Sequence, residues 1–420
     1  MARTHSLKPL PSLTLMISII SIAPVVADED HYNNIIIGDR PAGMGGAYTA
    51  ISDDPSGLYY NPAGLVYASG SGVSGSMNAY HITKTTYKNA LGGETDWTRQ
   101  SSNFLPNFFG IFQNLGNAKI GFSYAILDSI RENQDQRFVN LTQTQNAIDE
   151  YVINFNNQED VYNFGVSYAS EVSDKFSWGL TLYAHSRTRE RILHEYIAFN
   201  ATSGGDYEES TKYFSVDEQG IKPVFGLMWS PWNKVSLGLN INKTFLTSYE
   251  KTSQSTLKLQ GESTVARSVT TSNDTRNLPL NIRAGGAYFP SEKLLLSGDL
   301  SYYQSYENRN SVLNIALGTE YYLNPVWALR GGFYTNHANT PKLTNQGLEP
   351  GELQLEHVDM YGLSIAFARF TNNSSLSVGL NYSYGSGKAQ LFPANNNGTA
   401  LLQDTEMSSL TFFISATSSY

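Results

Sequence analysis

The chain has 420 residues, a net charge of -9, 15% charged residues, 12% aromatic residues and no cysteine. Without cysteine there is no disulfide framework, thiolate metal site or cysteine nucleophile, and the negative charge argues against a nucleic-acid partner, which requires a basic surface. A soluble domain of this size would carry nearer a quarter charged residues. Low charge with many aromatic residues favours a membrane barrel, in which one face of each strand meets lipid.

The first 27 residues have the pattern of a secretory signal peptide. Arg3 and Lys8 precede an apolar run over residues 10–26, which ends in small residues at Ala27 before an acidic stretch. Pro11 and Pro24 interrupt this run, and its longest apolar core is shorter than the roughly 20 residues that cross a bilayer as a helix. We therefore predict an exported protein that is cleaved after Ala27, rather than one anchored by this segment.

Residues 28–70 are rich in glycine and do not alternate as a strand would. They predict a compact plug of about 40 residues inside the lumen of a barrel, which we call the hatch. Glycines permit its tight turns, and the Asp-Asp and Asn-Pro-Ala-Gly sequences are typical of turns or helix caps. The residues of this hatch motif are Gly43, Gly45, Gly46, Asp53, Asp54, Asn61, Pro62, Ala63 and Gly64.

Residues 71–420 predict an all-β, antiparallel transmembrane barrel of about 14 strands. In residues 375–385 and 234–245, large apolar residues alternate with Ser, Gly, Thr and Asn, and this period of two places them on opposite faces. Six such hairpins, one strand within 71–88 and one within 407–420 give the strand number. A soluble sandwich or propeller also has short alternating strands, but it would bury large residues where this chain repeats small polar ones.

Short turns and long polar connections alternate along the predicted barrel, as periplasmic turns and extracellular loops do. The long connections lie near residues 88–106, 127–160, 188–221, 246–280, 304–312, 336–357 and 386–407. Trp178, Trp229, Trp232 and Trp327 flank short turns, which is typical of a membrane interface. Only Trp97 lies in a long connection.

The last strand ends in an aromatic residue. Phe412 and Ile414 share one face and are in phase with Tyr420. This pattern resembles the signal that outer-membrane barrels present to the barrel assembly machinery, which we therefore expect as a partner together with outer-membrane lipid.

Residues 44–65, MGGAYTAISDDPSGLYYNPAGL, followed by such a barrel, resemble the FadL-type family of bacterial outer-membrane transporters for long-chain fatty acids and other hydrophobic compounds. The resemblance implies passive uptake of a hydrophobic small molecule. The ligand would bind first among extracellular loops, pass the hatch and leave sideways through a kink in the wall. No cofactor or energy source is implied.

The loop expected over residues 188–221 supplies apolar candidates for ligand binding, namely Ile192, Leu193, Tyr196, Ile197 and Phe199. The loop expected over residues 246–280 is a departure from the family, because among many Ser and Thr it offers only Leu257, Leu259 and Val265. The candidate side chains could equally pack the loops against each other.

Other functions remain as alternatives. Related motifs occur in secretion-associated (PorV-like) barrels, so a barrel that binds partners at the cell surface without small-molecule transport is the main one; a general porin or an adhesin is weaker. An enzyme is not expected, because the chain lacks a GxSxG nucleophile elbow and its seven His residues lack metal-ligand spacing. We expect no metal, no cofactor and a monomer.

Overall fold

The computed structural model describes residues 30–90, 95–141, 148–201, 205–392 and 394–420. The predicted signal peptide, residues 1–27, lies outside the described residues. Within them, no helix combines the length and the apolar character needed to cross a bilayer.

The first described segment holds three short helices: α1 (Asp39–Gly43), α2 (Gly57–Tyr60) and the 3-10 helix η1 (Pro62–Tyr67). The strands follow in chain order: β1 (Gly72–Tyr87), β2 (Trp97–Leu115), β3 (Ala118–Leu141), β4 (Ile148–Ser173), β5 (Phe176–Phe199), β6 (Tyr207–Trp232), β7 (Val235–Asn242), β8 (Phe245–Leu259), β9 (Ala266–Ser272), β10 (Asn281–Ser291), β11 (Leu294–Tyr303), β12 (Val312–Asn324), β13 (Trp327–Asn336), β14 (His357–Phe370), β15 (Ser374–Gln390) and β16 (Leu402–Ser419).

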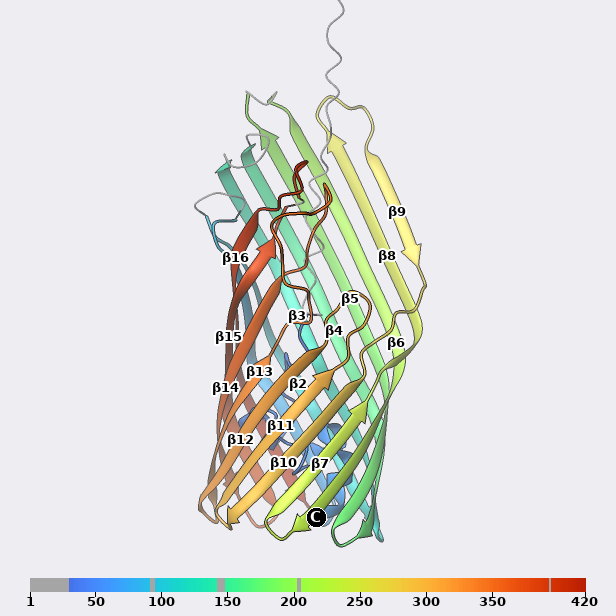
Figure 1. Cartoon of the computed structure of the whole chain (residues 1–420), viewed down its shortest axis with the longest axis vertical. Helices are drawn as coiled ribbons and strands as arrows, with labels where there is room; N and C mark the ends of the chain where they lie inside the picture. Colours follow the sequence, from blue (N-terminus) through green and yellow to red (C-terminus); the bar gives the residue numbers. More distant parts are fainter. Residues whose placement is uncertain (1–29, 91–94, 142–147, 202–204, 393) are drawn as a thin grey trace, which may run out of the picture.

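The strands form one closed antiparallel barrel (Figure 1). Consecutive strands pair from β1 to β7 and from β10 to β16, and β7 pairs with β10. β1 pairs with β16 from Gly72↔Ser419 to Tyr87↔Thr405, which closes the wall. The lower half of β6 pairs with β7 and its upper half with β8, so β7 and β8 share one position in the wall. The barrel therefore has 14 strands, as predicted, and the β8–β9 hairpin extends one side of it.

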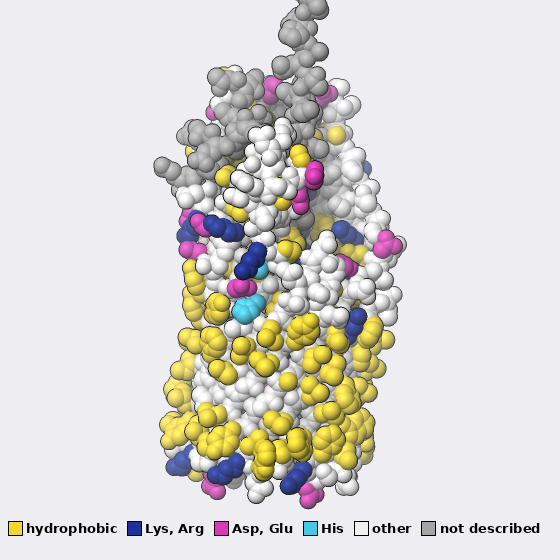
Figure 2. Space-filling view, in the orientation of Figure 1, with side chains coloured by type: hydrophobic (Ala, Val, Ile, Leu, Met, Phe, Trp, Pro, Cys, Tyr) yellow, Lys and Arg dark blue, Asp and Glu magenta, His cyan; other side chains and the backbone are white. Residues whose placement is uncertain are grey.

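Alternation along the strands separates a lipid-facing side from a lumen. In β15, Leu376, Val378 and Leu380 are exposed, whereas Ser377 and Asn381 are buried. Figure 2 shows apolar side chains gathered in a belt across the lower half of the face in view, with charged residues beyond both edges. We call this the apolar belt. It is the outward face that a membrane-spanning barrel requires, because a bilayer core leaves charged groups unsolvated.

On one side, strands continue well beyond the apolar belt, where long loops were predicted. The structure has β3 and β4 across residues 127–160, β5 and β6 across 188–221, and β8 and β9 within 246–280. These corrections have one cause. The outer faces of the extensions are mostly polar and their inner faces mix charged with apolar residues, so regular hydrophobic alternation does not mark them. The inner charges pair with each other: Arg187 donates to Glu159 at 2.7 Å and to Glu218 at 3.2 Å.

Candidate functional site

The N-terminal segment, residues 30–70, packs against inward-facing residues of the barrel wall near its lower end (Figure 1). Its helices are short because Gly and Pro interrupt them, and the backbone groups they leave unpaired bond to the wall instead. Two parts of the wall make most of these bonds. We call the contacts with β12, β13, β15 and β16 the ionic side, and those with β5, β6 and β7 the neutral side.

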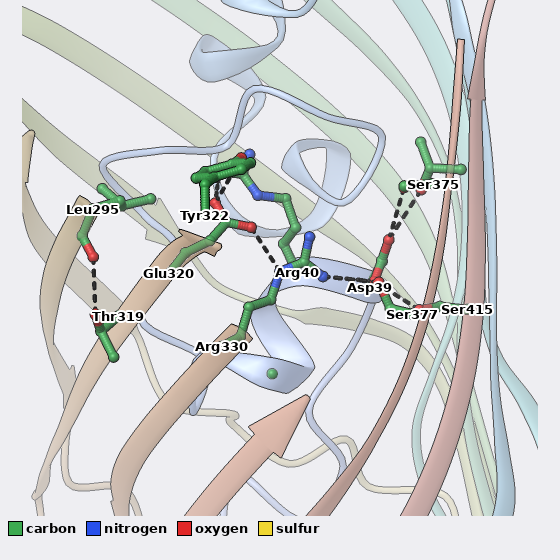
Figure 3. Close-up of polar contacts among 12 residues, drawn as sticks. Asp39, Arg40, Leu295, Thr319, Glu320, Tyr322, Arg330, Ser375, Ser377 and Ser415 are labelled. Carbon is green, nitrogen blue, oxygen red and sulfur yellow. Dashed lines mark hydrogen bonds and ion pairs between the residues drawn. The ribbon is translucent and has the colours of Figure 1, made fainter. Parts of the chain in front are cut away.

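The ionic side centres on Arg330 of β13, which is completely buried. Its guanidinium donates to Glu320 Oε1 at 2.7 Å and to Asp39 Oδ1 at 3.0 Å (Figure 3). Arg40 donates to the other oxygen of Glu320 at 2.7 Å and also pairs with Asp53. Two arginines and three carboxylates thus form one chain of ion pairs between α1 and the wall, and such buried charges are tolerable only when paired.

Hydroxyl groups complete the environment of Asp39. Ser415 donates to Asp39 Oδ1 at 2.7 Å, and Ser377 accepts from Arg330 at 3.0 Å (Figure 3). Close by in the same segment, burial raises the pKa of the Asp54 carboxyl to about 6, although Arg40 opposes the shift. Asp54, next to the ionic side, therefore has a pKa well above the usual range of a carboxyl group.

The neutral side centres on Asn61, the first residue of the predicted Asn-Pro-Ala motif. Its amide donates to Thr49 O and to Leu227 O of β6, each at 2.9 Å, while its side-chain oxygen accepts from Ala63 N at 3.2 Å. Pro62 begins η1, where a missing N–H costs nothing. Asn61 thus caps η1 and ties it both to the rest of the segment and to the wall.

Side chains of the wall satisfy further carbonyls on the neutral side. Ser177 donates to Ala63 O at 2.8 Å, Thr181 to Leu58 O at 2.9 Å and Asn240 to Tyr60 O at 2.7 Å. Between the two sides, Asp299 of β11 accepts from the backbone N–H of Tyr48 and of Thr49, each at 3.0 Å. The segment is therefore fixed around most of its circumference.

Glycines lie on the inner wall where the N-terminal segment comes closest. A Cβ on Gly226 would collide with Asn61 Oδ1, one on Gly238 with Thr49 O, and one on Gly332 with the backbone of Gly45. Gly110, Gly121, Gly179, Gly285 and Gly318 meet the same segment from other strands. These glycines create the space that the segment occupies. In the sequence they were recognised only as part of the small polar face of the strands.

The remaining residues of the predicted hatch motif serve the same packing. Gly45 and Gly46 have φ angles of 65° and 82°, which favour glycine. Gly43 lies against Ala366 and Arg330, and Gly64 lies against Ser52. The sequence did not single out Asp39, Arg40, Glu320 or Arg330. The sequence feature that could have indicated Glu320 and Arg330 is a charged residue on a strand face that is otherwise made of small residues.

Two cations face the lumen beside the N-terminal segment. Lys222 Nζ lies 5.8 Å from the centre of the Tyr59 ring, and the Arg283 guanidinium lies 5.2 Å from that of Tyr60. Arg283 also donates to Ser301 at 2.9 Å. Within the described part of the chain, neither cation has a carboxylate within ion-pair distance. A cavity of about 30 Å³ lined by Arg283, both rings and several apolar residues adjoins them.

The wall is interrupted between β2 and β3. Their ladder runs from Leu115↔Ala118 to Phe108↔Ala125, and Ser101↔Glu132 is the only pair beyond it. Pro106 has no N–H to donate, which accounts for part of the interruption. We call residues 102–107 and 126–131 the β2–β3 seam. It lies at the extracellular edge of the apolar belt, with Phe104 70% exposed on its outer face.

Side chains bridge the β2–β3 seam in place of a ladder. Asn103 donates to Ser129 O at 2.6 Å, and Ser101 Oγ accepts from Arg131 N at 2.8 Å. On the lumen side, Asn107 donates to Ile36 O of the N-terminal segment at 3.2 Å. The seam therefore connects the membrane face of the barrel with that segment.

The predicted ligand-binding loop is not a loop. Ile192, Leu193, Tyr196, Ile197 and Phe199 all belong to β5, and only Leu193 and Ile197 are buried. They join a cluster at the extracellular end of the barrel that we call the extracellular cluster. Its other members include Tyr87, Trp97, Phe138, Tyr151, Phe155 and Leu391, with Phe199 packed against it.

At the end of the chain, Phe412 and Tyr420 are exposed on the outer face of the barrel, and Ile414 is half-buried on that face. Their role in barrel assembly stays a prediction. Among the described residues, no group of three or more His, Asp and Glu side chains is arranged to hold a metal ion.

No protein-family model and no curated protein matches the chain, but solved structures do. A FadL homologue from Pseudomonas aeruginosa has a TM-score of 0.65 at 13% identity over 91% of this chain and 98% of its own. The Ralstonia pickettii toluene transporter TbuX gives 0.63 at 16% over 93% and 100%, and the P. putida toluene transporter TodX 0.62 at 15% over 91% and 98%. The chain has the fold of the FadL-type outer-membrane barrels.

Proposed function

We propose that the chain carries hydrophobic small molecules passively through the outer membrane, with the N-terminal segment acting as a hatch and the β2–β3 seam as a lateral exit. The observation that carries the proposal is the meeting of these two features at the apolar belt: Asn107 of the seam bonds to Ile36 of the segment. A molecule that reached this point would pass directly into lipid without crossing the glycine-lined contact below.

Two further features support the route. The extracellular cluster supplies an apolar surface at the upper end, and the seam lies below it on the same strands β2 and β3. Two of the similar solved structures, TbuX and TodX, are by name toluene transporters. This supports transport over the secretion-associated alternative, which no feature of the described residues favours.

Lys222 and Arg283 indicate which hydrophobic molecules are carried. Both are half-buried, partial desolvation of a cation without a carboxylate partner is costly, and an anionic headgroup would offset that cost for both. We therefore favour amphipathic carboxylates, such as long-chain fatty acids, over neutral hydrocarbons. Replacing both residues by Gln should weaken binding of oleate by about tenfold or more, because charge-assisted hydrogen bonds contribute roughly 1.5–3 kcal/mol each, and should leave oleyl alcohol unaffected.

A reversible cross-link tests the exit. The chain has no cysteine, so Asn103→Cys with Ser129→Cys introduces one disulfide across the β2–β3 seam. Uptake of labelled oleate by cells that carry this variant should fall about tenfold when oxidised and recover on reduction. The control is Gln113→Cys with Ile120→Cys, which joins the same strands at an intact pair. Unchanged uptake with the seam cross-linked would exclude this exit, whatever the ligand is.

A further inference from the structure

A groove lies on the lipid-facing side of the barrel at its periplasmic end, across the wall from the lumen. It has a volume of about 400 Å³, within the roughly 300 to 1,000 Å³ that is usual for small-molecule sites. It crosses β1, β14, β15 and β16, which are neighbours in the sheet. It is lined by the apolar residues Val73, Gly75, Leu376 and Ala416, by the hydroxyl residues Thr371, Ser374, Ser375, Thr417 and Ser418, and by Arg369.

The groove exists because side chains become small on two paired strands at this end. Along the outer face of β16, Leu410 and Phe412 are followed by Ala416 and Ser418. On β1 the residue paired with Ala416 is Gly75, and a Cβ added there would meet nothing within 4 Å. At Gly75 and Ala416 the outer face therefore leaves room for a chain-like apolar ligand.

Arg369 places a positive charge at the periplasmic edge of the groove. It is exposed, it follows Phe367 on the outer face of β14, and the strand ends one residue later at Phe370. Its cross-strand neighbours are Trp327 and Leu376, and neither carries a charge. Within the described part of the chain, its guanidinium has no ion pair or hydrogen bond.

A groove of small apolar and hydroxyl side chains that ends at an arginine without an ion pair matches an acidic lipid in shape and charge. Phosphate groups lie at the membrane interface, and arginine binds a phosphate through two parallel N–H bonds. We propose that this groove binds one acidic glycerophospholipid of the periplasmic leaflet, with an acyl chain over Gly75 and Ala416 and the phosphate on Arg369. The site is separate from the transport route, and its occupancy does not depend on what the lumen carries.

Native mass spectrometry of the full chain in detergent tests the proposal, with phosphatidylglycerol and phosphatidylcholine as probes. The wild type should retain one phosphatidylglycerol in preference to phosphatidylcholine. Arg369→Gln should lower phosphatidylglycerol retention about tenfold, as expected for losing a charged hydrogen bond. Ala416→Phe, which fills the groove, should remove retention of both lipids.

Lys175→Gln is the matched control, because Lys175 is an exposed cation in another short turn, between β4 and β5. It should retain lipid as the wild type does. Equal losses in Lys175→Gln and Arg369→Gln, or normal retention in Ala416→Phe, would overturn the proposal. If Ala416→Phe does not fold, as judged by its heat-modifiable migration in gels, Gly75→Leu fills the same groove from β1 and must give the same loss.

Discussion

Towards β12, β13, β15 and β16 the N-terminal segment is bound by buried charges, whereas towards β5, β6 and β7 it is bound by neutral donors to its own carbonyls. The two sides differ in how they could be released. Removing one member of a buried ion pair leaves an uncompensated charge. Neutral bonds contribute roughly 0.5–1.5 kcal/mol each, so they can be exchanged one at a time. We therefore expect the ionic side to be a fixed anchor and the neutral side to yield first if the segment moves.

Breaking the ionic side should have the largest effect. Arg330→Met leaves Asp39 and Glu320 buried without their shared cation, and we expect a loss of about 3–5 kcal/mol in the free energy of unfolding. Urea unfolding of the refolded protein in detergent micelles measures it. Arg137→Gln, at an exposed ion pair with Glu150, should lose less than about 1 kcal/mol. Similar losses in the two variants would mean that the ionic side is not an anchor.

Crowding the neutral side should have a smaller effect. Gly226→Ala places a methyl group against Asn61 Oδ1, and overpacking of this kind costs about 1–3 kcal/mol. Gly75→Ala, where the added carbon meets nothing, is the control and should be close to neutral.

A double variant makes the test specific to this contact. If the methyl group collides with the Asn61 side chain, Asn61→Ala should lessen the effect of Gly226→Ala, and the two losses should differ from additivity by more than about 0.5 kcal/mol. Strictly additive losses would place the strain elsewhere in the wall.

The sequence predicted the wall more completely than the contacts inside it. Strands in the apolar belt could be recognised because one face is apolar, as with Leu376, Val378 and Leu380. The extension of β5 could not, because Arg187, Arg189 and Arg191 lie among other polar residues, and the ion pairs that Arg187 and Arg189 make with Glu159 inside the lumen leave no pattern in the sequence. Hydrophobic periodicity reports where lipid or an apolar core begins, not where a strand ends.

The contacts of the N-terminal segment divide in the same way. Turn chemistry is local, so Gly45 and Asn61 could be recognised within a few residues of sequence. The partners of the ionic side are far apart: 291 positions separate Arg330 from Asp39. A single sequence contains no local pattern that pairs them, although a buried arginine among small residues requires a partner of some kind.

A change of pH distinguishes the two sides without breaking either. Burial raises the pKa of Asp54, next to the ionic side, to about 6 from 3.8. The folded state holds this proton more tightly than the unfolded state does. The protonated carboxyl therefore contributes to the free energy of unfolding fully below about pH 4, and this contribution is lost as the pH rises through 6. Asp54→Asn should therefore raise the free energy of unfolding at pH 7.5 by up to about 3 kcal/mol relative to the wild type, and by less than about 1 kcal/mol at pH 4. Asn61→Ala on the neutral side should give the same loss at both pH values, since an amide does not titrate. An Asp54→Asn effect that is equal at the two pH values would show that the carboxyl is ionised throughout, and the pH dependence would then belong to neither side.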